Sequence, residues 1–305
     1  MAHEQKPGNS SLSRAMQGVL FIGLSAYLAH LIQADKLSLY IVPRLEPAVR
    51  AAGLALFLLG AWQALQSLRD TIPRYACACE EGRKPGLRRK LAALWLALPL
   101  LLGALLPDTV LGASVADKKG LVWNPGDYAA KSAELYAGGG GGKGGGGKDG
   151  GGSPQSFSPE VSAARLREYE LLADELHGQD WIRIGDVGYM ERLAAMDLNR
   201  ERFVGKTLQL SGFVYPAEDR AGAFFLSRLV MQCCSADSLP YGLLIEGAEA
   251  TAFKRDDWVR VTGTLREVPY QNQMILALTA VSVESMEKPS SPYVYPYTGA
   301  YADLP

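Results

Sequence analysis

Three long apolar runs without a charged side chain occupy the first third of the chain, and they constrain its fold more than any other feature. They lie at 15–32, 51–68 and 91–107, and the first two are 18 residues long. A helix needs about 17–25 apolar residues to cross the roughly 30 Å of hydrocarbon in a bilayer. The runs could instead be core helices of a soluble α domain, but such helices usually carry charged residues on one face. The runs therefore predict three transmembrane helices, at about 15–32, 48–68 and 91–107.

The distribution of Lys and Arg predicts how these helices are oriented. The 69–90 connection holds seven Lys and Arg and the N-terminal tail two, against five on the opposite side. Cytoplasmic loops are enriched in Lys and Arg. We therefore expect a multi-pass cell-membrane protein with a cytoplasmic N-terminus and an extracytoplasmic C-terminal part. A cleaved signal peptide is the alternative for the first run, although no clear A-x-A site follows it.

Two residues near the predicted outer membrane surface are candidates for a role there. His30 is the only His, Lys, Arg, Asp or Glu within the three runs, and it lies near the outer end of the first. Ionisable residues inside a membrane are functional candidates, although an interfacial histidine is the plainer interpretation. Arg44 lies in the loop 33–47, whose prolines predict an ordered turn.

A glycine tract at 138–153 divides the rest of the chain. It contains 12 of the 33 glycines and cannot bury apolar surface. Such a chain behaves as a flexible coil with a reach of roughly 20–25 Å. We expect a transmembrane domain over 1–110, an extracytoplasmic linker over 111–157 and an extracytoplasmic domain over 158–305. A low-complexity insertion without a role of its own is the other interpretation of the tract.

Alternating apolar and polar residues dominate the chain after residue 205. Period-two patterns predict strands, and spacing of three and four predicts helices. The predicted strands are 207–215, 223–231, 241–246, 258–267 and 274–284, and the predicted helices are 158–176, 186–196 and a short one at 248–256.

Glycines inside two of the predicted strands favour a barrel over an open sheet. Gly212 and Gly263 interrupt otherwise apolar runs, as happens where a barrel strand bends sharply. Five such strands predict an extracytoplasmic α+β domain built around an OB-like five-stranded β barrel, OB being the oligonucleotide/oligosaccharide-binding fold. An open sheet packed on two helices is the alternative.

The charge of this domain argues against nucleic acid as a partner. OB barrels often bind nucleic acid through basic grooves and aromatic side chains. Here residues 1–110 carry a net charge of +5 and residues 111–305 carry −6. We expect no nucleic-acid binding, and we expect Arg228, Arg260 and Arg266 on the barrel surface.

An adjacent cysteine pair is the main candidate for chemistry. Cys233 and Cys234 follow the second predicted strand, and Asp237 comes three residues later. Thiols outside the cytoplasm tend to be oxidised, and adjacent cysteines close only a strained ring. This group suggests thiol redox chemistry or capture of a transition metal such as Zn or Cu. Packing of two small residues is the alternative. Arg228 begins the same stretch and is also a candidate functional residue.

A second cysteine pair lies in the basic 69–90 connection. Cys77 and Cys79 precede two glutamates, and no histidine lies in this loop. A stable zinc site normally takes four ligands. Transient metal binding and exposed reduced thiols are therefore both possible interpretations.

Catalytic signatures are missing from the chain. It contains no Walker motif, G-x-S-x-G, H-E-x-x-H or kinase signature, and its only histidines are His3, His30 and His177. We therefore expect a non-catalytic protein, with thiol redox activity as the alternative.

Five ordered motifs together resemble the YcgQ-type family of bacterial permease-subunit proteins. They are LSLYIVPR at 37–44, NRERFVGK at 199–206, CCSAD at 233–237, DWVRVTGT at 257–264 and KPSSPYVY at 288–295. The resemblance extends over nearly the whole chain except the glycine tract. It implies a two-component membrane system, in which this protein accompanies a larger polytopic permease of the YcgR type. Many relatives carry a His-rich cytoplasmic loop, where this chain has only Cys77 and Cys79.

Three functions are therefore open. The first is a non-catalytic accessory subunit of a bacterial two-component membrane permease, anchored in the lipid bilayer, whose barrel gates or captures the substrate. The second is an extracytoplasmic thiol- or metal-handling membrane protein that uses Cys233, Cys234 and Asp237. The third is a structural envelope protein whose barrel binds cell-wall glycan.

Overall fold

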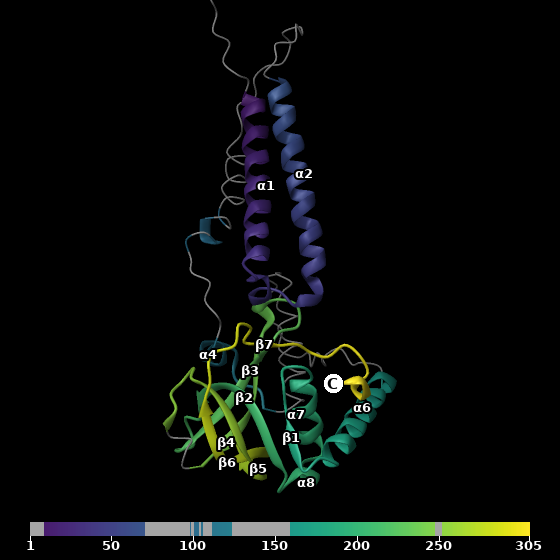
Figure 1. The fold of residues 1–305 in the computed structure, drawn as a ribbon, viewed down its shortest axis with the longest axis vertical. Coiled ribbons are helices and arrows are strands. Elements are labelled where there is room, and N and C mark those ends of the chain that lie inside the picture. Colours follow the sequence, from purple (N-terminus) through teal and green to yellow (C-terminus); the bar gives the residue numbers. More distant parts are fainter. Residues whose placement is uncertain are drawn as a thin grey trace, which may run out of the picture. The chain divides into compact units, whose positions relative to one another are not determined.

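The computed structural model describes two separate compact units of the chain (Figure 1). They comprise Met1–Thr109 and Val110–Pro305. The described residues are 9–70, 98, 101–103, 105, 112–123, 159–247 and 252–305.

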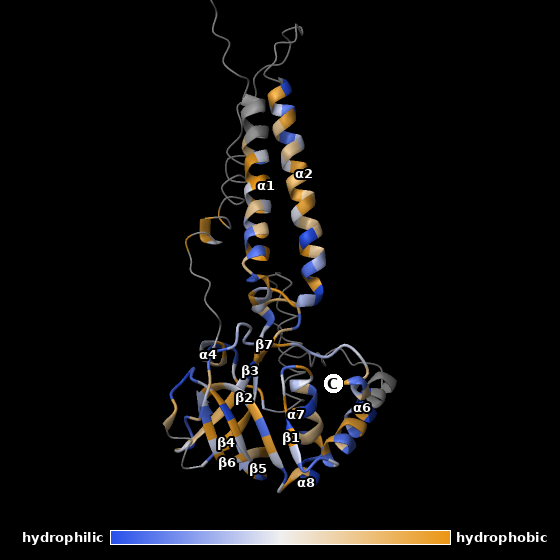
Figure 2. Cartoon of the chain, viewed as in Figure 1, coloured by the Kyte–Doolittle hydropathy of each residue, from blue (hydrophilic) through white to orange (hydrophobic). Residues whose placement is uncertain are grey.

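The first unit contains two long apolar helices, α1 (Asn9–Gln33) and α2 (Glu46–Asp70). Two short 3-10 helices, η1 (Leu37–Leu39) and η2 (Pro43–Leu45), join them, as expected for an ordered loop. Two segments, Met16–Gln33 and Pro43–Arg69, are long and apolar enough to cross a membrane. In the apolar window of each, only 11% of the residues are buried. Figure 2 shows apolar residues along both helices. Two of the three predicted spans thus have a candidate helix.

The third predicted span, 91–107, lies mostly outside the described residues. Its described positions, 98, 101–103 and 105, are helical. Three transmembrane helices, and the orientation of the chain, therefore stay a prediction.

Small residues let α1 and α2 pack closely. A Cβ atom on Gly60 would lie 2.9 Å from the Gly18 carbonyl oxygen and from Ile22 Cγ1. Further along, the Ser25 hydroxyl donates a hydrogen bond of 2.9 Å to the Gly53 carbonyl. Close backbone approach at glycines and hydrogen bonds from serine are the usual means by which helices associate in lipid.

The second unit is a closed five-stranded barrel. Its strands are β2 (Thr207–Pro216), β3 (Ala223–Val230), β4 (Leu239–Glu246), β5 (Trp258–Tyr270) and β6 (Gln273–Ser285). Their order is β2-β5-β6-β4-β3, and an additional antiparallel pairing of β3 with β2 closes the barrel. All pairs are antiparallel except β4 with β6. This connectivity is compatible with an OB fold, and the alternative of an open sheet is wrong.

Gly212 and Gly263 lie where a side chain has no room. A Cβ on Gly212 would lie 2.5 Å from the Ser227 carbonyl oxygen, and one on Gly263 would lie 2.3 Å from the Thr279 carbonyl oxygen. The pairing of β5 with β6 also shifts its register at Gly263. Glycine is thus required at these two positions because the backbone of a neighbouring strand approaches closely, whereas the sequence pattern predicted a sharp bend there.

Helices and two short strands complete the second unit. They are α4 (Ala113–Lys119), α6 (Pro159–His177), β1 (Trp181–Arg183), α7 (Tyr189–Leu198), α8 (Arg200–Phe203) and β7 (Tyr293–Val294). Strand β1 pairs in parallel with β2, and β7 pairs in parallel with β3. The predicted helices over 158–176 and 186–196 correspond to α6 and α7. In the predicted helix at 248–256, residues 248–251 lie outside the described ones, and Ala252–Asp256 contains no α-helix.

The segment after α4 is part of the barrel unit. Val122 forms a parallel bridge with Tyr241, in which its N–H donates to the Pro240 carbonyl at 2.9 Å. This bridge occupies the first part of β4, whereas β6 pairs with residues 244–246. Trp123 lies against the rings of Phe225 and Tyr270, with centroid distances of 5.8 and 5.4 Å. The glycine tract thus connects two segments of one unit, 112–123 and 159–305.

We expect deletion of residues 138–152 to leave the barrel as stable as before. The deletion shortens the connection between Trp123 and Pro159 from 35 to 20 residues. Loop-closure entropy then favours the folded state by only about 0.5 kcal/mol. Urea unfolding of the detergent-solubilised chain, followed by near-ultraviolet circular dichroism, measures the change.

A Trp123→Ala variant is the control for this measurement. Loss of its ring contacts with Phe225 and Tyr270 should lower the free energy of unfolding by about 2 kcal/mol or more. A deletion variant destabilised as strongly as this control would mean that the tract itself contacts the barrel.

Candidate functional site

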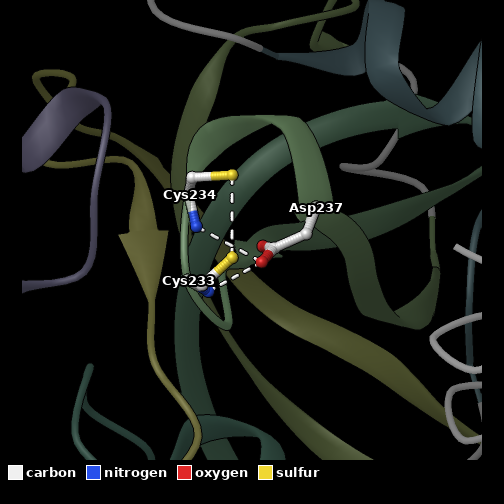
Figure 3. A group of neighbouring side chains, drawn as sticks. All are labelled: Cys233, Cys234 and Asp237. Atoms are coloured by element: carbon white, nitrogen blue, oxygen red, sulfur yellow. Dashed lines mark hydrogen bonds between the residues drawn. The ribbon is translucent and has the colours of Figure 1, made fainter. Parts of the chain in front are cut away.

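The loop between β3 and β4 is organised by one carboxylate. Asp237 ends the 3-10 helix η3 (Ser235–Asp237), and its side chain turns back toward the start of the loop (Figure 3). Oδ2 accepts hydrogen bonds from the backbone N–H of Cys233 at 2.7 Å and of Cys234 at 3.2 Å. Oδ1 accepts one from the N–H of Gln232 at 3.0 Å. A carboxylate that accepts three backbone N–H groups holds this short loop in one conformation.

The two thiols lie side by side and are not joined. The Sγ atoms of Cys233 and Cys234 are 3.7 Å apart, and both cysteines are free and half-buried. A disulfide would need about 2.05 Å between the sulfurs. Together with a carboxylate oxygen of Asp237, these sulfurs form a group of three donor atoms, all within 4.8 Å of one another. The structure therefore brings the three predicted residues together as potential metal ligands.

The Asp237 carboxylate also controls the protonation of Cys233. A hydrogen bond to Asp237, burial and the neighbouring Cys234 raise the pKa of the Cys233 thiol to about 12. A thiol reacts as a nucleophile only after deprotonation. Cys233 is therefore a poor nucleophile at neutral pH as long as no cation replaces its proton.

Lys119, at the end of α4, supplies a positive charge beside the loop. Its ammonium group donates hydrogen bonds to the carbonyls of Ala236 at 2.6 Å and Ser238 at 2.9 Å. Burial lowers the pKa of Lys119, and electrostatic interaction with Asp237 and Cys234 opposes this shift. Lys119 was not predicted as part of this site, because no spacing rule links it to residues more than 110 positions away in the chain.

Arg228 lies inside the barrel unit, so its predicted position on the surface is wrong. Its side chain is 2% exposed, whereas Arg260 and Arg266 are exposed as expected. The guanidinium donates to Asp186 Oδ1 at 2.7 Å and lies 5.2 Å from the centre of the Trp258 ring. Arg228 therefore packs within the barrel unit. A functional role for this residue stays a prediction.

The other candidate residues lie in the first unit. Cys77 and Cys79 are outside the described residues, so metal binding there stays a prediction. His30 is exposed, three residues before the end of α1, and Arg44 is exposed in η2.

We expect Arg228→Met to be better tolerated than Arg228→Ala. Met keeps much of the side-chain length that packs against Trp258, and Asp186 is 62% exposed and therefore stays hydrated without its partner. Ala leaves a cavity in addition. The free energy of unfolding should differ by about 1 kcal/mol or more in favour of Met. Equal losses in urea unfolding would assign the stabilisation to the ion pair instead.

We expect Asp237→Asn to make Cys233 more reactive. Asn keeps an oxygen acceptor for the loop N–H groups but removes the negative charge, so the pKa of Cys233 falls from about 12. The alkylation rate by iodoacetamide at pH 9 should rise about tenfold or more, because the rate follows the thiolate fraction. The comparison uses a background in which Cys77, Cys79 and Cys234 are replaced by Ser. An unchanged rate would show that Asp237 does not control the thiol.

Two domain families match the chain. A model described as the DUF1980 N-terminal domain matches residues 16–122, and one described as the DUF1980 C-terminal domain matches residues 162–296. The first match ends at Val122, the residue that bridges to β4.

Two bacterial proteins are similar in sequence. UPF0703 protein YcgQ of Bacillus subtilis (strain 168) is 23% identical over 223 residues, which cover 70% of this chain and 72% of that protein. A protein of Streptococcus mutans serotype c is 27% identical over 207 residues, 66% of this chain and 71% of that protein. It is named as a candidate two-component membrane permease complex subunit. The YcgQ-type resemblance is confirmed, and with both domains matched the chain belongs to the DUF1980 family.

Proposed function

We propose that this protein is a non-catalytic accessory subunit of a bacterial two-component membrane permease. The observation that carries the proposal is the similarity to a relative named as a candidate subunit of such a complex. The two candidate membrane helices, α1 and α2, are consistent with it. In the proposal, the DUF1980 C-terminal domain is an OB-like barrel that lies outside the cytoplasm and meets the substrate or the permease there.

We propose that the two described membrane helices, α1 and α2, serve docking rather than conduction. Helices α1 and α2 pack directly on each other at Gly18 and Gly60, which leaves no room between them at that level. Large apolar side chains of α2 are exposed, namely Leu54, Phe57, Leu58, Leu59, Trp62 and Leu65. An apolar helix face of this kind contacts lipid or another membrane helix. We propose that a larger polytopic partner of the YcgR type provides the transport pathway.

The barrel is not suited to binding nucleic acid at its usual face. OB barrels bind oligonucleotides mainly on their second and third strands, which are β3 and β4 here. Trp123 stacks on Phe225 of β3, so the chain itself covers part of this face. The net charge of −6 on residues 111–305 also repels phosphates. Both features favour a protein or small solute as the ligand of this domain.

We expect the full-length chain to co-purify with a polytopic membrane protein. An affinity tag on this chain, mild solubilisation of its native membranes and mass spectrometry of the eluate identify the partner. A Gly60→Leu variant forces α1 and α2 apart, because a Cβ there already lies 2.9 Å from the Gly18 carbonyl. It should recover much less partner than the wild type.

A Val281→Ala variant is the control for this experiment. Val281 is an exposed apolar residue of the barrel, so its loss should not affect helix docking. Recovery of the wild-type chain alone, from membranes in which a polytopic YcgR-type permease is present, would overturn the proposal.

A further inference from the structure

We propose that Cys233, Cys234 and Asp237 form a binding site for a thiophilic divalent cation, with zinc as the best fit. The three residues offer two sulfurs and one carboxylate oxygen within 4.8 Å of one another. Sulfur ligands select zinc and similar transition metals over magnesium and calcium, which prefer oxygen. The site belongs to the barrel unit, and it does not depend on the proposed permease partnership.

The distance between the sulfurs fits a tetrahedral metal. Two thiolates at about 2.3 Å from a tetrahedral zinc ion lie about 3.8 Å from each other. The Sγ atoms of Cys233 and Cys234 are 3.7 Å apart. The two thiols can therefore take up the cation with almost no movement of their side chains.

The same geometry is poorly suited to a disulfide. The sulfurs would have to approach to about 2.05 Å, and the Cα atoms of adjacent residues are about 3.8 Å apart, below the range of about 4.4–6.8 Å that disulfides prefer. Asp237 holds the backbone N–H groups of both cysteines, at 2.7 and 3.2 Å, and so opposes the rearrangement that ring closure needs. Metal binding is therefore favoured over oxidation within the pair.

Asp237 can act as the third ligand without leaving its place in the loop. Oδ1 accepts a hydrogen bond from Gln232, whereas Oδ2 accepts two. Each carboxylate oxygen has about two acceptor positions, so Oδ1 keeps one for a cation. The hydrogen bonds to the loop hold the carboxylate in position before the cation arrives.

Three protein ligands leave one tetrahedral position open. A closed structural zinc site takes four protein ligands, whereas three ligands and an exchangeable fourth are typical of sites that bind a further molecule. Both cysteines are only half-buried, so the cation is accessible from solvent. Two thiolates and a carboxylate leave the loaded site with one negative charge, which the ammonium group of Lys119, bonded to the carbonyls of Ala236 and Ser238, offsets. The site thus suits capture and release of the cation.

Cobalt titration of the full-length protein tests this inference. The protein carries Cys77→Ser and Cys79→Ser, so that only Cys233 and Cys234 remain. We expect one Co²⁺ per chain, with thiolate-to-cobalt charge-transfer absorption, and displacement of Co²⁺ by one equivalent of Zn²⁺. A further Cys233→Ser and Cys234→Ser replacement should abolish the absorption. Absence of the charge-transfer band before this replacement, or its persistence afterwards, would overturn the proposal.

The role of the carboxylate has its own test. Asp237→Asn keeps a hydrogen-bond acceptor for the loop but weakens the third ligand, and we expect the Zn²⁺ dissociation constant to rise about tenfold or more. The matched control is Asp219→Asn, which changes the same charge in another loop of the barrel, where Asp219 accepts from Tyr270 at 2.8 Å. Near-ultraviolet circular dichroism establishes that both variants are folded. Equal zinc affinity in both variants would exclude Asp237 as a ligand.

Discussion

The second unit depends on the pairing of β2 with β3, which closes the barrel. Residues 207–213 pair with β5, and residues 213–216 pair with β3, so that Phe213 belongs to both ladders. Gly212 makes this possible, because a Cβ there would lie 2.5 Å from the Ser227 carbonyl. Closure of the barrel removes exposed strand edges and places alternate side chains of each strand in its interior.

Closure of the barrel also determines the conformation of the loop after β3, which carries the two thiols. Strands β3 and β4 pair over their whole lengths, from Ala223 with Glu246 to Val230 with Leu239. The connection between them is therefore short, and the carboxylate of Asp237 uses its hydrogen bonds to order it. The two thiols are thus held next to each other on a rigid hairpin, which is the arrangement a preorganised metal site needs.

Part of this arrangement could be predicted because it is local in the chain. All five strands were predicted with ends within three residues of those observed, since alternation reports a half-buried strand directly. The grouping of Cys233, Cys234 and Asp237 follows from their spacing on one loop. The predicted helix at 248–256 is wrong over its described residues, because so short a segment has no periodic pattern that separates a helix from a turn.

The sequence by itself determined the two apolar helices, the barrel strands, the positions of the strand glycines and the cysteine loop. Only the tertiary structure decided that Arg228 points inward, that Trp123 covers β3, and that Lys119 lies beside the loop, bonded to Ser238, 119 positions away. Which face of a strand is interior depends on which strands close the barrel. Contacts between residues so distant in the chain arise only once that closure has brought them together.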